Sequence, residues 1–275
     1  MTDAPDLDGF ARFDFTADLS PTANGDATTV TRPVYRSGTG PAVVVIHEVP
    51  GLTPKVADFG RRVADAGFTA YLPSLVGTPG RAFSNGYVAS SFWKVCVAKE
   101  FTNWALRTTS PVITWLRALA ERAHGECGGP GVGAVGMCFS GGFALGMMLD
   151  DRMIAPVLSQ PSMPFAFGKA RSADLGVSDA DLARIKERAA GGCDVLGLRF
   201  SHDRFVPDAR WERLQRELGE HFIAVELDSA PGNPHGHRKA AHSVLTEDLD
   251  DRPETPSRAA LDAVLDFYRE RLLPT

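Results

Sequence analysis

The chain has 275 residues, 44% of them hydrophobic, and a formal net charge of −5. This length suits one large α/β domain, so we expect a single domain over residues 1–275. The negative charge and the lack of a long basic run argue against nucleic acid or an anionic membrane as the main partner.

Strands and helices alternate in the predicted structure after a polar N-terminal arm, residues 1–27. Apolar runs and alternating patterns predict strands, whereas a spacing of three to four residues predicts helices. Strands are expected over Thr28–Tyr35 (an edge strand), Ala42–His47, Thr69–Leu75, Gly133–Met137, Ile154–Ser159, Asp194–Phe200 and Phe222–Leu227. Helices are expected over Thr53–Ala66, Pro111–His124, Ser178–Ala189, Asp208–Leu218 and Pro256–Leu272. The alternation predicts an α/β fold, with a mostly parallel, doubly wound sheet and helices on both faces.

Ligands of such sheets bind beyond the carboxyl ends of the strands. Residues 76–110 and 160–177 lack clear periodicity and are longer than ordinary connections, so they are candidate pocket walls or a partial lid. The first 17 residues are acidic and mixed, unlike a signal peptide, and no apolar stretch reaches 18 residues. We therefore expect a cytoplasmic protein.

The segment Val135-Gly136-Met137-Cys138-Phe139-Ser140-Gly141-Gly142 has the pattern of a nucleophile elbow with cysteine in the nucleophile position. A strand, a sharp turn and a helix would present the thiol at a helix N-terminus, where the dipole favours thiolate. The usual pattern has glycine where this chain has Ser140. The alternative is a buried, apolar cysteine in a glycine-rich turn.

The other cysteines, Cys96, Cys127 and Cys193, show neither CxxC nor metal-ligand spacing. We interpret them as structural or incidental thiols and expect no disulfide framework, metal or cofactor.

A nucleophilic thiol needs a base and a group that orients the base. Asp203 follows a predicted strand, and His242 lies between the last strand and the last helix, which gives the order nucleophile, acid, histidine of α/β-hydrolases. Alternatively, Asp203 is solvated and the nearby Asp208 caps a helix. A further alternative is a metal bound by His235, His237 and His242, which share one long loop.

The strand that ends at Ile46 continues as His47-Glu48-Val49-Pro50-Gly51. Hydrolases take the second oxyanion-hole amide from this place, so the amides of Val49 and Phe139 are the expected donors. Glu48 is either a surface charge or a partner of the thiol. His47 is interpreted as a packed or capping histidine.

These motifs together resemble the dienelactone hydrolases, the cysteine members of the α/β-hydrolase fold. The resemblance rests on residues 47–52, the Cys138 elbow, residues 202–207 and His242-Ser243, and it spans most of the chain after residue 30. It implies Cys138 as nucleophile, Asp203 and His242 as the rest of a triad, and Glu48 as the group that helps to ionise the thiol. Family members that act on dienelactone bind its carboxylate with arginines, one of them four residues after the catalytic histidine. That position is Thr246 here.

We therefore predict a hydrolase that cleaves a small-molecule ester or lactone other than dienelactone through an acyl-cysteine intermediate. Two alternatives remain from other classes. One is a redox or glyoxalase-like protein with a cysteine elbow, which the downstream Asp203 and His242 disfavour. The other is a binding protein that has kept the fold without catalysis, which turnover of a simple ester would exclude.

Overall fold

The computed structural model describes residues 7–19, 28–97, 109–163 and 168–273. Its centre is an eight-stranded sheet with the strand order β1-β2-β4-β3-β5-β6-β7-β8. The strands are β1 (Ala11–Asp18), β2 (Thr29–Gly38), β3 (Ala42–Ile46), β4 (Thr69–Pro73), β5 (Val132–Met137), β6 (Met153–Ser159), β7 (Val195–Phe200) and β8 (Phe222–Leu227). β1 and β2 pair antiparallel with their neighbours, and the strands from β4 to β8 are parallel. The predicted mostly parallel sheet is confirmed.

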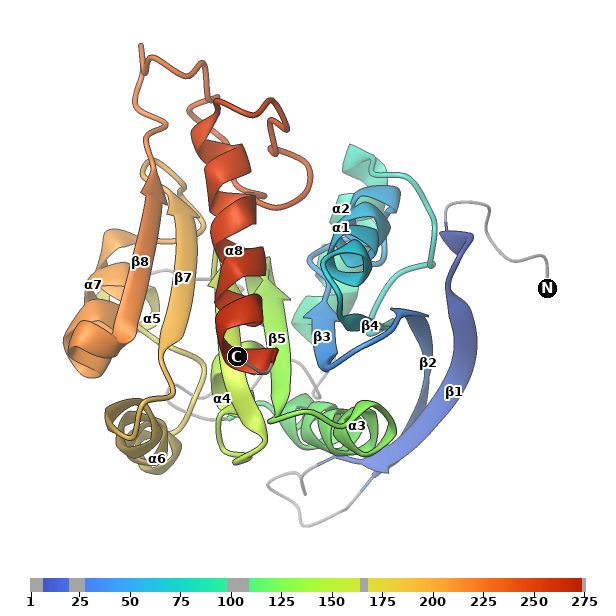
Figure 1. Cartoon of the computed structure of the whole chain (residues 1–275). Helices are drawn as coiled ribbons and strands as arrows, with labels where there is room; N and C mark the ends of the chain where they lie inside the picture. The colour runs from blue at the N-terminus through green and yellow to red at the C-terminus, as the bar shows by residue number, and fades with distance from the viewer. Residues whose placement is uncertain (1–6, 20–27, 98–108, 164–167, 274–275) are drawn as a thin grey trace.

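Helices cover both faces of this sheet (Figure 1). The helices are α1 (Pro54–Asp65), α2 (Asn85–Val97), α3 (Val112–Cys127), α4 (Gly141–Met147), α5 (Lys169–Ser172), α6 (Asp179–Ala190), α7 (Asp208–Leu218) and α8 (Pro256–Leu272), with short 3-10 turns at η2 (Cys138–Ser140) and η3 (Gly219–His221). Apolar residues of α1 and α8 share one core cluster, and those of α3, α4, α6 and α7 share the other. The central strands β3, β5 and β7 are buried along their whole length, as expected for parallel strands covered on both sides.

The N-terminal part of the sheet differs from the prediction. Residues 11–18, within the expected polar arm, form the edge strand β1, so β2 lies between β1 and β4 and is not an edge. In β1 only Phe15 is fully buried and most other side chains are exposed. An apolar signal this weak does not distinguish an edge strand from a polar arm.

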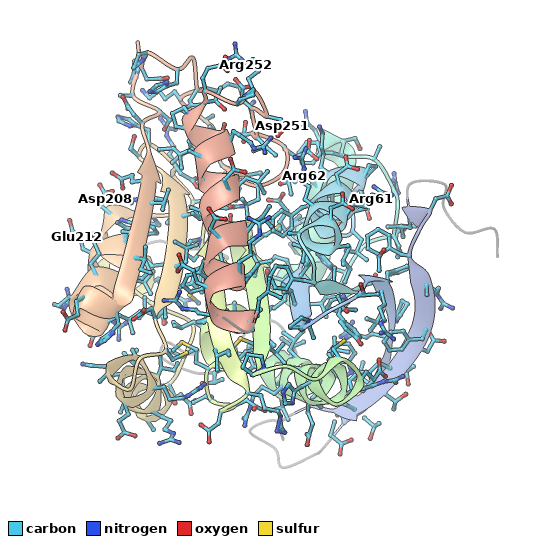
Figure 2. All side chains as sticks on the ribbon, in the orientation of Figure 1. Arg61, Arg62, Asp208, Glu212, Asp251 and Arg252 are labelled. Atoms are coloured by element: carbon cyan, nitrogen blue, oxygen red, sulfur yellow. The ribbon has the colours of Figure 1, made fainter. Side chains whose placement is uncertain are left out.

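Charged side chains lie around the outside of the molecule, among them Arg61, Glu212 and Asp208 (Figure 2). Asp208 is the first residue of α7 rather than its cap, and its carboxylate pairs with Arg199 at 2.8 Å. Of the helices in the described ranges, none combines the length and the apolar character needed to cross a bilayer.

Candidate active site

The strand, turn and helix predicted around Cys138 are all present as β5, η2 and α4. Cys138 has a φ of 56°, a left-handed conformation that residues other than glycine rarely adopt. A Cβ atom on Gly136 would lie 2.1 Å from the carbonyl oxygen of Ser140, so this close approach requires glycine. The sharp turn and the glycine before it are the features of a nucleophile elbow.

Ser140, the departure from the usual elbow pattern, has a structural role. Its side chain is fully buried, and its Oγ accepts the amide of Met137 at 2.8 Å. Its hydroxyl donates between two carbonyls, those of Ile46 at 3.0 Å and of Met137 at 2.9 Å. Ile46 is the last residue of β3. The hydroxyl therefore fastens the elbow to the strand that leads to Glu48 and Val49.

The thiol of Cys138 lies against a serine that the sequence did not single out. Cys138 Sγ is 3.0 Å from Ser162 Oγ, and the amide of Ser162 donates to the carbonyl of Cys138 at 2.9 Å. Ser162 is 6% exposed and follows β6, the strand beside β5. The sequence signal for this residue was only its place shortly after a predicted strand, in a segment expected to form a pocket wall.

Asp203 and His242 meet beyond the ends of β7 and β8. His242 Nδ1 donates to Asp203 Oδ2 at 2.6 Å, so the other ring nitrogen, Nε2, is the one available to a thiol. Burial lowers the pKa of His242, but the charge of Cys138 and the hydrogen bond with Asp203 outweigh burial and raise this pKa well above its usual value. The imidazole can thus hold a proton while a negative sulfur is nearby.

The histidines of the same loop are placed differently. His237 bonds through Nδ1 to the carbonyl of Asp228 at 2.8 Å, and its ring lies 5.9 Å from that of His235. Within the described ranges, no group of three histidine, cysteine or acidic side chains is placed to hold a metal ion. The alternative in which His235, His237 and His242 share a metal is therefore wrong.

The carboxylate of Asp203 is buried, 6% exposed, so the alternative of a solvated aspartate is also wrong. Its second oxygen, Oδ1, accepts the amide of Phe205 at 2.9 Å. The ring of Phe205 packs edge-on to His242 at 5.2 Å between centroids, yet 63% of the residue is exposed. Phe205 is thus an apolar surface directly beside the histidine.

His242 belongs to the long segment between β8 and α8, which rises above the strand ends in Figure 1. Asp248 holds this segment from inside: its Oδ2 accepts the amides of His242 at 2.8 Å and of Ser243 at 3.1 Å. Its Oδ1 pairs with the guanidinium of Arg238. The position of the His242 backbone therefore depends on one carboxylate.

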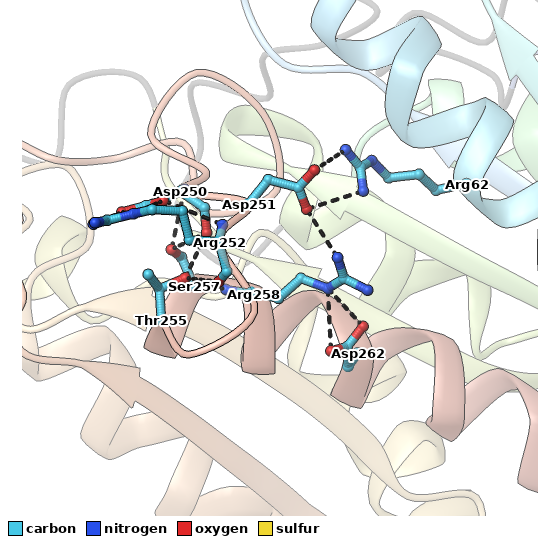
Figure 3. Close-up of polar contacts among 8 residues, drawn as sticks. All are labelled: Arg62, Asp250, Asp251, Arg252, Thr255, Ser257, Arg258 and Asp262. Atoms are coloured by element: carbon cyan, nitrogen blue, oxygen red, sulfur yellow. Dashed lines mark hydrogen bonds and ion pairs between the residues drawn. The ribbon is translucent and has the colours of Figure 1, made fainter.

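A second set of contacts holds the segment from outside (Figure 3). Asp251 pairs with Arg62 of α1 at 2.7 Å and with Arg258 of α8 at 3.2 Å. Arg258 also pairs with Asp262, one turn further along α8. These side chains are one third to one half exposed, so each pair contributes little stability.

Glu48 is buried, 4% exposed, and the alternative of a surface charge is wrong. Its carboxylate accepts hydrogen bonds from Gln160 Nε2 at 3.2 Å, from Ser243 Oγ at 2.7 Å and from Thr246 Oγ1. Donors that follow β6 and donors on the histidine segment therefore satisfy this carboxylate, which lies next to Val49.

The expected oxyanion donors occupy equivalent places after two neighbouring strands. β3 and β5 are parallel with Ile46 opposite Gly136, and Val49 and Phe139 each come three residues later. Phe139 directly follows Cys138 in the elbow turn. The two amides thus follow the carboxyl ends of two neighbouring parallel strands.

His47 is packed, as predicted. Its ring is fully buried, with Nδ1 bonded to the carbonyl of Glu48 at 2.7 Å and Nε2 accepting the amide of Leu75 at 3.0 Å. Burial lowers the pKa of His47 to about 4. The ring is therefore neutral at pH 7 and holds the end of β3 to the end of β4.

Comparisons with known proteins identify the family of this chain. The family model described as "Dienelactone hydrolase family" matches residues 27–271. The Escherichia coli (strain K12) protein named "Putative hydrolase fragment YghX" is 44% identical in an alignment of 66 residues that covers 22% of this chain and 56% of that protein. The match thus spans little more than half of that relative.

Solved structures share the fold. The "Putative Dienelactone Hydrolase" from Klebsiella pneumoniae subsp. pneumoniae MGH 78578 has a TM-score of 0.56 and 17% identity, covering 94% of this chain and 99% of its own. The "Dienelactone Hydrolase-like Promiscuous Phospotriesterase P91" from metagenomic libraries has a TM-score of 0.55 and 17% identity, covering 95% and 99%.

Proposed function

The chain belongs to the dienelactone hydrolase family of α/β-hydrolase enzymes, and we propose that it cleaves a small-molecule carboxylic ester or lactone through an acyl-cysteine intermediate. The observation that carries this proposal is the hydrogen bond between His242 Nδ1 and Asp203 Oδ2 at 2.6 Å, next to a thiol on a strained elbow. Nucleophile, base and orienting carboxylate are the parts that acyl transfer to a thiol requires.

In the acylation half, Cys138 gives its thiol proton to Nε2 of His242, and the thiolate attacks the carbonyl carbon. The amides of Val49 and Phe139 stabilise the negative charge that develops on the carbonyl oxygen. When the tetrahedral intermediate collapses, the carbon–oxygen bond to the alcohol breaks and the imidazolium returns its proton to the leaving oxygen. Asp203 keeps the imidazole in the required tautomer and stabilises its charge.

In the deacylation half, His242 takes a proton from water as the water attacks the thioester. The carbon–sulfur bond then breaks, the acid leaves, and the sulfur recovers its proton from the imidazolium. Each proton taken up by His242 is returned in the next step, so no external acid or base is consumed.

Glu48 supports the arrangement and, in our proposal, affects the charge of the thiol. A carboxylate near a thiol disfavours thiolate by charge, so Glu48 acts by keeping the resting thiol neutral until His242 takes its proton. Its hydrogen bonds to Ser243 and Thr246 connect it to the His242 segment. Changing Glu48 to Gln should lower ester turnover without reducing the access of a small alkylating agent to Cys138.

We also propose a cytoplasmic location and, since all described strands share one sheet, a single domain.

The proposal is tested by trapping the intermediate. Incubation of the purified chain with a slow aryl ester, followed by peptide mass spectrometry, should place the acyl group on Cys138. Changing Cys138 to Ala should reduce turnover by at least about a thousandfold, the scale for loss of a triad nucleophile. Cys127→Ser and Cys193→Ser are matched controls that should retain activity. Acylation of another cysteine, with activity lost in step, would overturn the assignment.

A further inference from the structure

Arg210 on α7 is a buried positive charge, 2% exposed, that the reaction described above does not use. A buried charge destabilises the fold unless it is paired or hydrogen-bonded. Its guanidinium donates to the carbonyls of Asp174 at 2.7 Å, Arg171 at 3.0 Å, Pro161 at 3.4 Å and Phe205 at 3.5 Å. These acceptors are backbone oxygens, which satisfy its donors, and the buried carboxylate of Asp174 attracts its charge.

The carbonyls that Arg210 binds belong to the two segments that carry the reacting groups. Pro161 directly precedes Ser162, whose hydroxyl touches the thiol of Cys138. Phe205 lies two residues after Asp203 and is bonded to it. Arg210 thus joins the segment beside the nucleophile to the segment of the acid.

The charge of Arg210 lies in an apolar part of the site. Burial lowers the pKa of Arg210 to about 10, and attraction to Asp174 and to Cys138 opposes this effect. A small cavity between α4 and α7, lined by Leu145, Leu175 and Leu214, adjoins both Ser162 and Arg210. Its apolar walls leave little water to screen the interaction.

Ser162 is held so that its hydroxyl faces the sulfur. Its amide is already bonded to the carbonyl of Cys138, which fixes its backbone, and its Oγ lies 3.0 Å from Cys138 Sγ. A thiolate has no hydrogen to donate, so toward the ionised sulfur the hydroxyl must be the donor. Hydrogen bonds to an ionised acceptor are about twice as strong as neutral ones.

We propose that Ser162 is a further catalytic residue whose hydroxyl stabilises the Cys138 thiolate, and that Arg210 is the positioning residue that fixes Ser162. The inference rests on the proposed acyl-cysteine function. When Cys138 transfers its proton to His242, Ser162 Oγ–H donates to the sulfur; when the carbon–sulfur bond forms, this hydrogen bond weakens. It forms again as the sulfur leaves the thioester, so Ser162 also favours deacylation.

Other charged groups belong to the same site. His242 and Asp203 lie on the segments after β8 and β7, Arg210 lies on α7 with Asp174 nearby, and Glu48 follows β3. His47, also after β3, is neutral at pH 7. The test must therefore change the hydroxyl of Ser162 and leave these groups in place.

The experiment measures the rate of Cys138 alkylation by iodoacetamide from pH 4 to 10 in the full chain and in Ser162→Ala. The pH of half-maximal reactivity should rise by about one unit in Ser162→Ala, a tenfold loss of thiolate at a given acidic pH. Ser162→Thr, which keeps a hydroxyl, should recover most of the shift. Ser90→Ala, on the exposed side of α2, is the control and should leave the profile unchanged.

Arg210→Lys keeps the charge but loses most of the carbonyl contacts. It should reduce kcat several-fold by displacing Ser162, with a smaller shift of the alkylation profile than in Ser162→Ala. An unchanged profile in Ser162→Ala, in a chain that still forms the acyl adduct on Cys138, would overturn the inference and leave the proposed function intact. Failure to form that adduct in the unaltered chain would overturn the proposed function instead.

Discussion

Thr246 donates a hydrogen bond to the carboxylate of Glu48, and both side chains are buried. Thr246 occupies the position, four residues after His242, where dienelactone-cleaving members of the family are expected to carry an arginine. In this chain the position holds Glu48 in place through a neutral hydroxyl. Thr246 therefore does not provide a positive charge that could bind a substrate carboxylate.

Removing the Thr246 hydroxyl should destabilise the fold. In Thr246→Val the shape is kept, but the buried carboxylate of Glu48 loses one donor, which should cost about 1–3 kcal/mol in the free energy of unfolding. Urea denaturation checks this value. Thr16→Val, on the exposed edge strand β1, removes a hydroxyl at the surface and should change the free energy of unfolding by less than about 0.5 kcal/mol.

The absence of arginine at position 246 also predicts the preferred substrates. Neutral esters or lactones should be turned over at least as efficiently as analogues of the same size that carry a carboxylate. The ratio of kcat/KM for such a pair measures this preference. A preference of about a hundredfold for the acidic compound is the size expected for one hydrogen bond to a charged group. Such a preference would indicate that another arginine binds the substrate carboxylate. Arg81, which stacks on Tyr87, and Arg238, which pairs with Asp248, are the residues to change in that case.

His242 is the predicted base. Changing His242 to Ala should lower kcat by at least about a hundredfold, the usual scale for a general acid–base residue. His237→Ala and His235→Ala are the matched controls from the same loop and should cost far less, because neither is the ring bonded to Asp203. Steady-state kinetics with one aryl ester rank the three variants, and the reverse ranking would contradict the assignment.

Asp248 and Asp251 hold the same segment by different means, which allows a paired experiment. Asp248→Ala removes the acceptor for the His242 amide, so kcat should fall by about ten- to a hundredfold through misplacement of the base. Asp251→Ala breaks only the exposed ion pairs with Arg62 and Arg258 (Figure 3) and should change kcat less than about threefold. Equal losses in the two variants would show that the outer contacts, rather than Asp248, position the histidine.

The lowered pKa of His47 predicts how the free energy of unfolding depends on pH. Its pKa is about 4 in the folded chain, below the usual 6.5, so the unfolded chain binds more protons between these values. Its contribution is fully present above about pH 6.5 and is lost as the pH falls toward 4, up to about 3 kcal/mol. The free energy of unfolding, measured by urea denaturation, should differ less between pH 4.5 and pH 7 in His47→Gln than in the unaltered chain. An identical difference would assign the acid sensitivity to other groups.

The sequence predicted the central sheet well, since β3 to β8 are apolar runs bounded by turn residues. It missed α2, which begins at Asn85 in a segment without clear periodicity. The order of Cys138, Asp203 and His242 along the chain was enough to predict which side chains meet. Ser162 and Arg210 could not be predicted in this way. Arg210 lies among charged residues on an amphipathic helix, and only packing against residues 161 and 171–174 buries it.

The hydroxyl of Ser140 gives the two halves of the active site different local stabilities. It joins the elbow of Cys138 to the end of β3, in the centre of the sheet, and central strands open only when the whole chain unfolds. The histidine is carried by a segment held largely through side chains such as Asp248, and segments of that kind open at lower free energy. On heating, activity should therefore be lost at a lower temperature than the one at which the sheet unfolds. Cooling from between these temperatures should restore activity, because the sheet still holds Cys138 in position.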